Sequence, residues 1–431
     1  MGAAVGLQAM WVVLGEVLGV GIAWLCMARR FKRLTDRYDS ITIPDYLESH
    51  FQDRAQVLRR IAALSLVVFV TIYVGAQIDA TGQAFESFLG IDYFTGAIVG
   101  FVVVLAYIVT GGFLAVVWSD VIQGILMFLG LTLLPIWALV AAGGLDPIVR
   151  SLEASEPGLL SFFGPRGPTM ETWLQIVAFS AIGIGFLESP QIFVRFLALR
   201  SEAEIPRGAW VAILWTVLAD SGAVFTGMFG RALLTGDALA AVLDSEEQVL
   251  PLLVEHLFPL ALVGVYVAIV LSAIMSTIDS LLVVASSAVV RDWYQKVRRP
   301  DLSDEQLTSL ARLVTFGLAS FALVVALVVA ISTPERTIFW FVIFGWSGIA
   351  CTFCPTIILS LFWSRFTRNG AIAAMVTGFA CVPLFKFGVY RIPGWGEALA
   401  PLEEMIPAFL CSFLAGFVVS LTGRGKNDLG G

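Results

Sequence analysis

Charged residues and histidines are scarce in this sequence of 431 residues. Asp, Glu, Lys and Arg together make up 14% of the chain, which has only two histidines and five cysteines. The cysteines lie in or beside apolar segments, and the pair in ACTFCPT (350–356) has no second pair to complete a zinc site, which argues against metal or redox chemistry. No nucleophile–base pair is apparent, so a membrane enzyme is the least favoured class, and nothing suggests nucleic-acid binding.

Hydrophobic residues make up 58% of the chain, and the mean hydropathy of +0.89 is far above that of a soluble protein. A helix needs about 20 apolar residues to cross a bilayer. The apolar segments must be helices, because unpaired backbone groups are too costly in lipid and no segment alternates like a barrel strand. The sequence therefore predicts an all-α polytopic membrane protein of the cell membrane with about eleven transmembrane helices, near residues 4–28, 58–88, 94–113, 114–142, 171–197, 207–235, 258–290, 307–331, 338–362, 370–388 and 405–422.

Basic residues in the connections predict the orientation, because such residues are enriched on the cytoplasmic side. Alternation of the spans places the basic stretches 28–37, 291–299 and 363–368 on one side, together with the tail around Arg424 and Lys426. The acidic or nearly neutral connections fall on the other side. We expect an external N-terminus and a cytoplasmic C-terminus, with no cleavable signal peptide and no soluble domain.

Six acidic residues lie inside the predicted spans, where an ionisable group costs about 2.5–3.5 kcal/mol and often marks a pathway. They are Glu16, Asp79, Asp120, Glu188, Asp220 and Asp279. Asp79 and Asp220 could instead lie near span ends, and Glu16 could face a neighbouring helix. Asp120 and Asp279 are the stronger candidates, because each belongs to a polar group.

The stretch LSAIMSTIDSLLVVASSAVVRDWYQ (271–295) is unusually polar for an apolar span. One helical stripe consists of Ala273, Ser276, Thr277 and Ser280. Asp279 borders that stripe, and hydroxyl, carboxylate and freed carbonyl oxygens replace the water shell of a hard cation. Serine and threonine can also allow close helix packing or bond back to their own helix. With Asp279 beside the hydroxyl groups, a cation site is the favoured interpretation.

A second polar group lies in YIVTGGFLAVVWSDVIQ (107–123). Asp120 is placed near the cytoplasmic end of its span, at a depth similar to that of Asp279. The two carboxylates could therefore share one cation.

A third group, FSAIGIGFLESPQIFVRF (179–196), contains helix-breaking residues. Gly183, Gly185 and Pro190 predict a broken helix at mid-membrane. Broken helices hold substrate in secondary transporters, and Glu188 inside this one favours a functional break over a mere kink.

Five stretches together resemble the sodium:solute symporter family, and within it most closely the sodium/proline symporters. They are ITIPDYLESHFQD (41–53), GGFLAVVWSDVIQ (111–123), GFLESPQIFVRF (185–196), AIMSTIDSLLVVASSAVVRDWY (273–294) and WSRFTRNGAIAAMVTG (363–378), in family order along nearly the whole chain. The resemblance implies a LeuT-type fold, in which two inverted five-helix repeats and additional helices place sodium and substrate at the midplane.

The resemblance also implies two sodium sites. At the sodium site common to the family, the predicted span 258–290 would contribute Ala273, Ser276 and Thr277. The place where some members hold a second sodium ion matches Asp120, Ser276, Asp279 and Ser280. Those members usually carry a serine where this chain has Asp279, and the additional acid could strengthen cation binding or, if protonated, admit a proton instead.

The substrate residues that the resemblance implies depart from the sodium/proline symporters. Where those carry tryptophan and tyrosine this chain has Ile182 and Phe186, and Glu188 replaces a glycine, while Pro190 is retained. Gln8 and Trp11 lie on the first span, at positions expected to face the same pocket. The expected substrate is a small polar organic solute, an amino acid such as proline or a related compound.

The resemblance further implies that the chain is N-terminally truncated and lacks its first core helix. Met1 falls where the family enters its second core helix, and family members have two more spans than the eleven expected here. The absent helix would supply the rest of the common sodium site. We expect one transmembrane domain over residues 1–431, with the remaining core helices in 1–362 and additional C-terminal helices and a short cytoplasmic tail in 363–431.

These features predict a symporter that imports its solute by alternating access, with Na⁺ as the coupling ion and no organic cofactor. The expected partners are the small-molecule solute and the lipid bilayer, with no obligatory protein partner. A proton-coupled symporter that uses Asp279 or Asp120 and a non-transporting truncated fragment are the alternatives. A membrane sensor module would need a cytoplasmic domain, and the short tail 423–431 argues against it.

Overall fold

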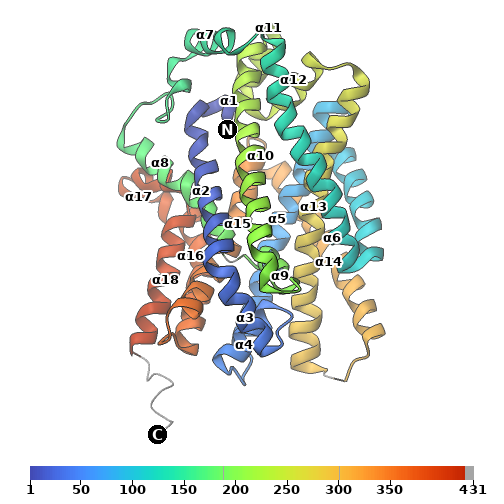
Figure 1. The fold of residues 1–431 in the computed structure, drawn as a ribbon, viewed down its shortest axis with the longest axis vertical. Helices are drawn as coiled ribbons and strands as arrows, with labels where there is room; N and C mark the ends of the chain where they lie inside the picture. Colours follow the sequence, from blue (N-terminus) through green and yellow to red (C-terminus); the bar gives the residue numbers. More distant parts are fainter. Residues whose placement is uncertain (188, 300, 423–431) are drawn as a thin grey trace.

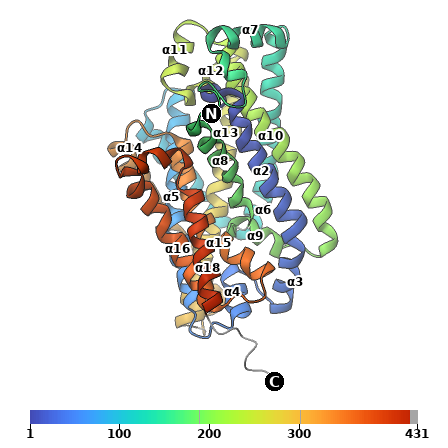
Figure 2. The same ribbon diagram turned by 90° about the vertical axis from the view of Figure 1, so that its left-hand side faces the viewer.

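The structure is a computed structural model that describes residues 1–187, 189–299 and 301–422, except for the side chains of residues 107, 109–115, 304 and 395. This described part is helical and contains no strand, as the sequence predicts. The long helices stand side by side along one direction, with α7, α11 and α12 at one end of the bundle and α3 and α4 at the other (Figure 1, Figure 2).

The described α-helices have the following bounds. They are α1 (Gly2–Val5), α2 (Met10–Ile22), α3 (Ala28–Tyr38), α4 (Ile43–Phe51), α5 (Val57–Leu89), α6 (Tyr93–Ala141), α7 (Leu145–Ser155), α8 (Met170–Ala181), α9 (Pro190–Leu197), α10 (Ile205–Leu233), α11 (Gly236–Asp244), α12 (Val249–Leu257), α13 (Leu260–Ser287), α14 (Asp304–Ser332), α15 (Ile338–Phe362), α16 (Arg368–Phe387), α17 (Trp395–Leu399) and α18 (Met405–Thr422). Short 3₁₀ and π segments extend or connect them, namely η1 (Gly6–Ala9), η2 (Ala23–Met27), η3 (Pro157–Leu160), η4 (Ile182–Leu187), η5 (Glu202–Glu204), η6 (Glu246–Gln248), η7 (Ala288–Arg298), η8 (Val389–Arg391) and η9 (Ala400–Leu402).

Ten helical stretches of the described chain are long and apolar enough to cross a membrane. The predicted spans 94–113 and 114–142 both lie within α6, whose first arm, Tyr93–Ala106, is apolar but shorter than the other candidates. Each of the eleven predicted segments thus corresponds to a helical stretch, which is interrupted in the case of 171–197, and the difference in number comes from the short first arm of α6.

The two arms of α6 run in opposite directions. The first arm begins beside the C-terminal end of α5, where Gly96 lies against Phe85. In the second arm, Asp120 meets Ser280 in the latter half of α13, whereas Gly130 meets Ile269 nearer the beginning of that helix. The second arm therefore runs antiparallel to α13 and returns to the end of the bundle from which the first arm started.

The basic stretch 28–37, which was expected to be a connection, is helical and continues the first span to Tyr38. One face of α3 is apolar: the fully buried ring of Phe31 packs edge-on against Tyr46 and Phe193, with ring centroids 5.2 and 4.7 Å apart. The four arginines of this helix are exposed, whereas Lys32 is buried and donates a hydrogen bond to the carbonyl oxygen of Leu197 at 3.2 Å. A buried face keeps the chain helical beyond the apolar span.

Candidate functional site

The helix predicted to break at mid-membrane is broken. α8 ends at Ala181, the 3₁₀ segment η4 follows, and α9 begins with Pro190 at its first position, where the missing N–H of proline costs nothing. The hydroxyl of Ser189 donates a hydrogen bond to the carbonyl oxygen of Gly185 at 2.5 Å. Glu188, the predicted substrate residue inside the break, lies outside the described residues.

Glycines bring α2 and η4 into backbone contact. A methyl group on Gly19 would lie 2.0 Å from the carbonyl oxygen of Gly183, and one on Gly183 would lie 1.9 Å from that of Gly15. No side chain fits between the two segments at these distances. The glycines therefore hold the broken segment against the first long helix.

Beside this break, residues from α2, α5, η4, α9, α13 and α15 enclose a cavity of about 410 Å³. Its lining residues are Glu16, Tyr73, Ile182, Phe186, Gln191, Ile192, Ser276, Thr277, Ser280, Leu281, Phe339, Val342, Ile343 and Trp346. Three predicted sodium residues and two predicted substrate residues thus line one cavity. These are Ser276, Thr277, Ser280, Ile182 and Phe186.

Aromatic rings form one wall of the cavity. The indole N–H of Trp346 donates a hydrogen bond to the carbonyl oxygen of Ile182 at 3.0 Å, which ties α15 to the broken segment. The Trp346 ring lies 5.1 Å from that of Phe186 and 6.3 Å from that of Tyr73, measured between centroids. A methyl group on Gly185 would lie 2.2 Å from the indole, so only glycine allows this approach.

The hydroxyl groups of α13 converge on one backbone carbonyl. Ser276 and Thr277 both donate hydrogen bonds to the oxygen of Ala273, at 3.0 and 3.1 Å. Serine and threonine hydroxyl groups inside helices commonly bond back to a carbonyl oxygen three or four residues earlier. Ser276 and Thr277 line the cavity and bring two hydroxyl oxygens to it, and oxygen is the ligand type that a sodium ion takes.

The predicted second cation site contains a guanidinium group. Arg195 of α9 forms an ion pair with Asp120 and donates a hydrogen bond to the hydroxyl oxygen of Ser280 at 2.7 Å. Ser280 in turn donates to Asp120 at 3.3 Å. Asp279 is fully buried next to Ser280. A positive charge of the protein itself therefore lies among these residues.

The structure places the remaining candidates away from the cavity. Gln8 is buried and its amide donates to Gln175 at 3.3 Å, while the indole of Trp11 donates to the carbonyl oxygen of Phe162 at 2.9 Å. Pro190 lines a separate cavity of about 290 Å³ between α4, α9 and α13. Neither Gln8 nor Trp11 is among the residues that enclose the central cavity.

Tyr73, Trp346 and Arg195 are site residues that were not predicted from the sequence. Tyr73 and Trp346 belong to uniformly apolar spans, where one more aromatic residue is unremarkable. Gly345 and Gly348 were the only hint in the sequence that another helix packs closely against α15. Methyl groups at these positions would clash with Tyr73 and Phe69. Arg195 could have been suspected as a cation close to a helix break.

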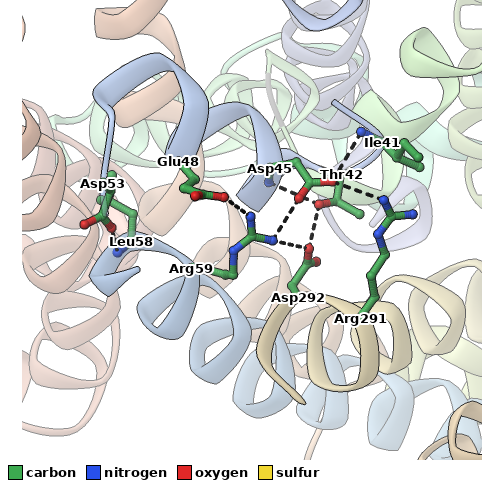
Figure 3. A network of polar contacts seen from close by, with 9 residues as sticks. All are labelled: Ile41, Thr42, Asp45, Glu48, Asp53, Leu58, Arg59, Arg291 and Asp292. Carbon is green, nitrogen blue, oxygen red and sulfur yellow. Dashed lines mark hydrogen bonds and ion pairs between the residues drawn. The ribbon is translucent and has the colours of Figure 1, made fainter. Parts of the chain in front are cut away.

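A second polar cluster lies at the end of the bundle that carries α4 (Figure 3). The fully buried guanidinium of Arg59 forms ion pairs with Asp45 and Asp292, each at 2.8 Å, and with Glu48. Thr42 caps α4 by accepting a hydrogen bond from the backbone N–H of Asp45, and its hydroxyl donates to Asp292 at 2.8 Å. The cluster thereby joins α4, α5 and η7, the π segment that continues α13.

The profile of the sodium:solute symporter family matches residues 1–378 of this chain, which includes every described residue of the central cavity. The chain belongs to the sodium:solute symporter family. It is accordingly an integral membrane transporter and not an enzyme.

Curated relatives of this symporter match nearly its whole length. It is 37% identical over 419 residues to the high-affinity proline transporter PutP of Bacillus subtilis, covering 96% of this chain and 84% of the relative. It is 32% identical over 425 residues to the sodium/proline symporter of Salmonella typhimurium, covering 97% and 80% respectively.

Solved structures support the fold of the symporter. A Na⁺-coupled sialic acid symporter in a substrate-bound outward-open state matches with a TM-score of 0.73 at 18% identity, over 98% of this chain and 87% of that one. MhsT in complex with L-phenylalanine matches with a TM-score of 0.51 at 15% identity, over 97% and 96%. The expected LeuT-type fold is confirmed.

Proposed function

We propose that this protein is a sodium-coupled symporter that imports a small polar organic solute by alternating access. The observation that carries the proposal is the single cavity of about 410 Å³ that both the α13 hydroxyl groups and the broken segment η4 line. Hydroxyl and carbonyl oxygens suit a hard cation, and a broken helix offers backbone groups to a solute. Na⁺ is the proposed coupling ion, and no organic cofactor is proposed.

The lining of the cavity favours a solute with a polar group and a small apolar part. Tyr73, Phe186 and Trp346 offer apolar ring surface, whereas Thr277 and Gln191 offer polar groups. An amino acid such as proline has both a polar group and a small apolar part. The names of the relatives point to the same solute class.

The membrane potential and the sodium gradient supply the energy for accumulation. Each inward sodium ion gains about 2.3 kcal/mol per 100 mV, and about 1.4 kcal/mol more per tenfold gradient. One ion can therefore sustain roughly several-hundred-fold accumulation, because each 1.4 kcal/mol is tenfold. Sodium acts by stabilising the outward-open state, so that coupling is a shift in population.

We also propose that the end of the bundle with α3, α4 and η7 faces the cytoplasm. Exposed basic residues collect there, among them Arg33, Arg60 and Arg298. Such residues are enriched on the cytoplasmic side of cell membranes.

Uptake of radiolabelled L-proline into proteoliposomes tests the proposal. An inward sodium gradient should drive uptake, and Thr277→Ala should raise the sodium concentration for half-maximal uptake about tenfold, as expected for loss of one ligand to a charged group. Thr132→Ala is the matched control, because Thr132 also bonds back to its own helix, at 2.6 Å from the oxygen of Phe128, but does not line the cavity. An unchanged sodium dependence in Thr277→Ala would refute the site.

Proton coupling is the second candidate function, and the position of Glu16 favours testing it. Glu16 is an acidic residue of α2 that lines the central cavity. Acidic residues inside spanning helices often belong to proton relays in transporters. Uptake driven by a pH gradient without sodium, and abolished by Glu16→Gln, would establish proton coupling in place of sodium coupling.

A further inference from the structure

An apolar groove opens on the outside of the bundle near its basic end. It has a volume of about 510 Å³, more than the central cavity, and lies between α5, η7 and α14, which contact one another. Apolar side chains line it, including Leu64 and Val67 of α5 and Val314 of α14. Arg60 is the single charged residue in its lining.

The groove faces the surrounding lipid and not the interior of the protein. Leu64 is 57% exposed and Trp293 of η7 is 37% exposed, and both line the groove. Its floor is open at Gly317 of α14, where a methyl group would meet nothing within 4 Å. An aliphatic chain could therefore lie in this space against apolar surface on three helical segments.

Positive charge collects where the groove meets the basic end of the bundle. Arg60 is exposed, and Arg298 places its guanidinium over the ring of Trp293, 5.4 Å from the centroid. Neither arginine has an ion pair with a carboxylate among the side chains that the structure describes. Tryptophan and arginine at this depth are typical of the boundary between acyl chains and headgroups.

We propose that this groove binds one anionic phospholipid of the leaflet at the basic end of the bundle. One acyl chain lies over Gly317 between α5 and α14, and the phosphate group is held by Arg60 and Arg298. A zwitterionic lipid would bring its own cation next to two uncompensated guanidinium groups, whereas an anionic headgroup complements them. Basic pockets between spanning helices are known to hold acidic headgroups.

Native mass spectrometry of the full chain tests the proposal directly. The protein is equilibrated with an equimolar mixture of phosphatidylglycerol and phosphatidylcholine that carry the same acyl chains. We expect one retained lipid, enriched in phosphatidylglycerol. Arg60→Gln should lower that enrichment about fivefold, the weight of one basic residue at an anionic surface. Gly317→Leu should fill the floor and abolish retention.

Two matched variants separate the groove from general effects. Arg54→Gln removes an exposed arginine at the same end of the bundle but outside the groove. Gly264→Leu adds the same side chain at another exposed glycine that has open space around its Cβ position. Both should retain the lipid as the wild type does. Wild-type enrichment in Arg60→Gln, wild-type retention in Gly317→Leu, equal uptake of the two lipids, or a dimer that shields the groove would each overturn the proposal.

Discussion

Glu247 lies between α11 and α12 and reaches the start of a helix that lines the central cavity. Its carboxylate accepts a hydrogen bond from the backbone N–H of Ile338, the first residue of α15, at 2.6 Å. A carboxylate at this position complements the helix dipole. Burial nevertheless raises the pKa of Glu247 above its ordinary value, and the nearby charge of Asp79 raises it further, while the Ile338 hydrogen bond opposes the rise.

The raised pKa of Glu247 predicts a dependence of stability on pH. The unfolded chain ionises near the ordinary value of about 4.3, so the contribution of this group is complete below that pH and is lost as pH rises through the folded pKa. Glu247→Gln keeps the acceptor oxygen and removes the titration. Melting curves between pH 4.5 and 8 should show the variant gaining stability relative to the wild type as pH rises. Parallel curves would contradict this account.

Arg195 bears on the number of sodium ions that accompany each solute. A second ion bound by Asp120, Asp279 and Ser280 would have to displace a guanidinium that already contacts two of them. We therefore expect one sodium ion per solute in the wild type, measured as the ratio of ²²Na⁺ to solute flux in proteoliposomes. Arg195→Gln should raise the ratio towards two, whereas Arg200→Gln, an exposed arginine just after α9, should not. A ratio of two in the wild type would refute the expectation.

At the scale of whole elements, the close backbone contact between α2 and η4 positions the broken segment in the site. It depends on glycine backbones that touch without any intervening side chain. The broken segment carries both Ile182 and Phe186 into the cavity, so its position relative to α2 determines the shape of that wall.

A single methyl group should therefore disturb this contact. Gly19→Ala places the methyl 2.0 Å from the carbonyl oxygen of Gly183, and overpacking of this kind costs about 1–3 kcal/mol. Gly21→Ala on the same helix is the control, because its methyl would meet only the end of the Ile213 side chain, 4.0 Å away. The control should be neutral or stabilised by up to about 1 kcal/mol, the gain in helix propensity. Thermal unfolding of both variants compares them, and equal effects would show that the contact tolerates separation.

Local patterns in the sequence predicted the elements better than they predicted the partners of those elements. The break at Gly183, Gly185 and Pro190 and the hydroxyl stripe at Ser276 and Thr277 depend on neighbouring residues, and both are present in the structure.

Contacts between distant segments were not predictable in this way. Trp346 bonds to Ile182 across 164 residues, and Arg195 pairs with Asp120 across 75. Helical periodicity identifies the face on which a residue lies and not the helix that this face meets. Gln8 and Trp11 illustrate the limit, because their side chains bond to the segment that leads into α8 and to α8 itself, and not to the cavity.

At the scale of the whole molecule, the Arg59 cluster connects the stretch 41–53 to the far end of the helix that carries Ser276 and Thr277 (Figure 3). Both stretches support the resemblance to the family, although nothing in the sequence indicated that they meet. In the proposed alternating-access cycle, we expect α4 and η7 to move apart when the cavity opens towards this end of the bundle, and this movement would break the cluster.

Loss of the Arg59 side chain should reduce the stability of the protein strongly, because this cation is buried among carboxylates. Removing one partner of a buried ion pair costs about 3–5 kcal/mol, since the remaining charges are left uncompensated. Arg59→Met should lower the free energy of unfolding by that amount. Arg33→Met is the matched control, because Arg33 also forms an ion pair, with Glu202, but its side chain is 62% exposed against 1% for Arg59. Exposed pairs contribute about 0–1 kcal/mol, so unfolding of the two variants in detergent should differ by at least about 2 kcal/mol. Similar losses in both would mean that the Arg59 cluster is hydrated, and that its separation during transport costs little.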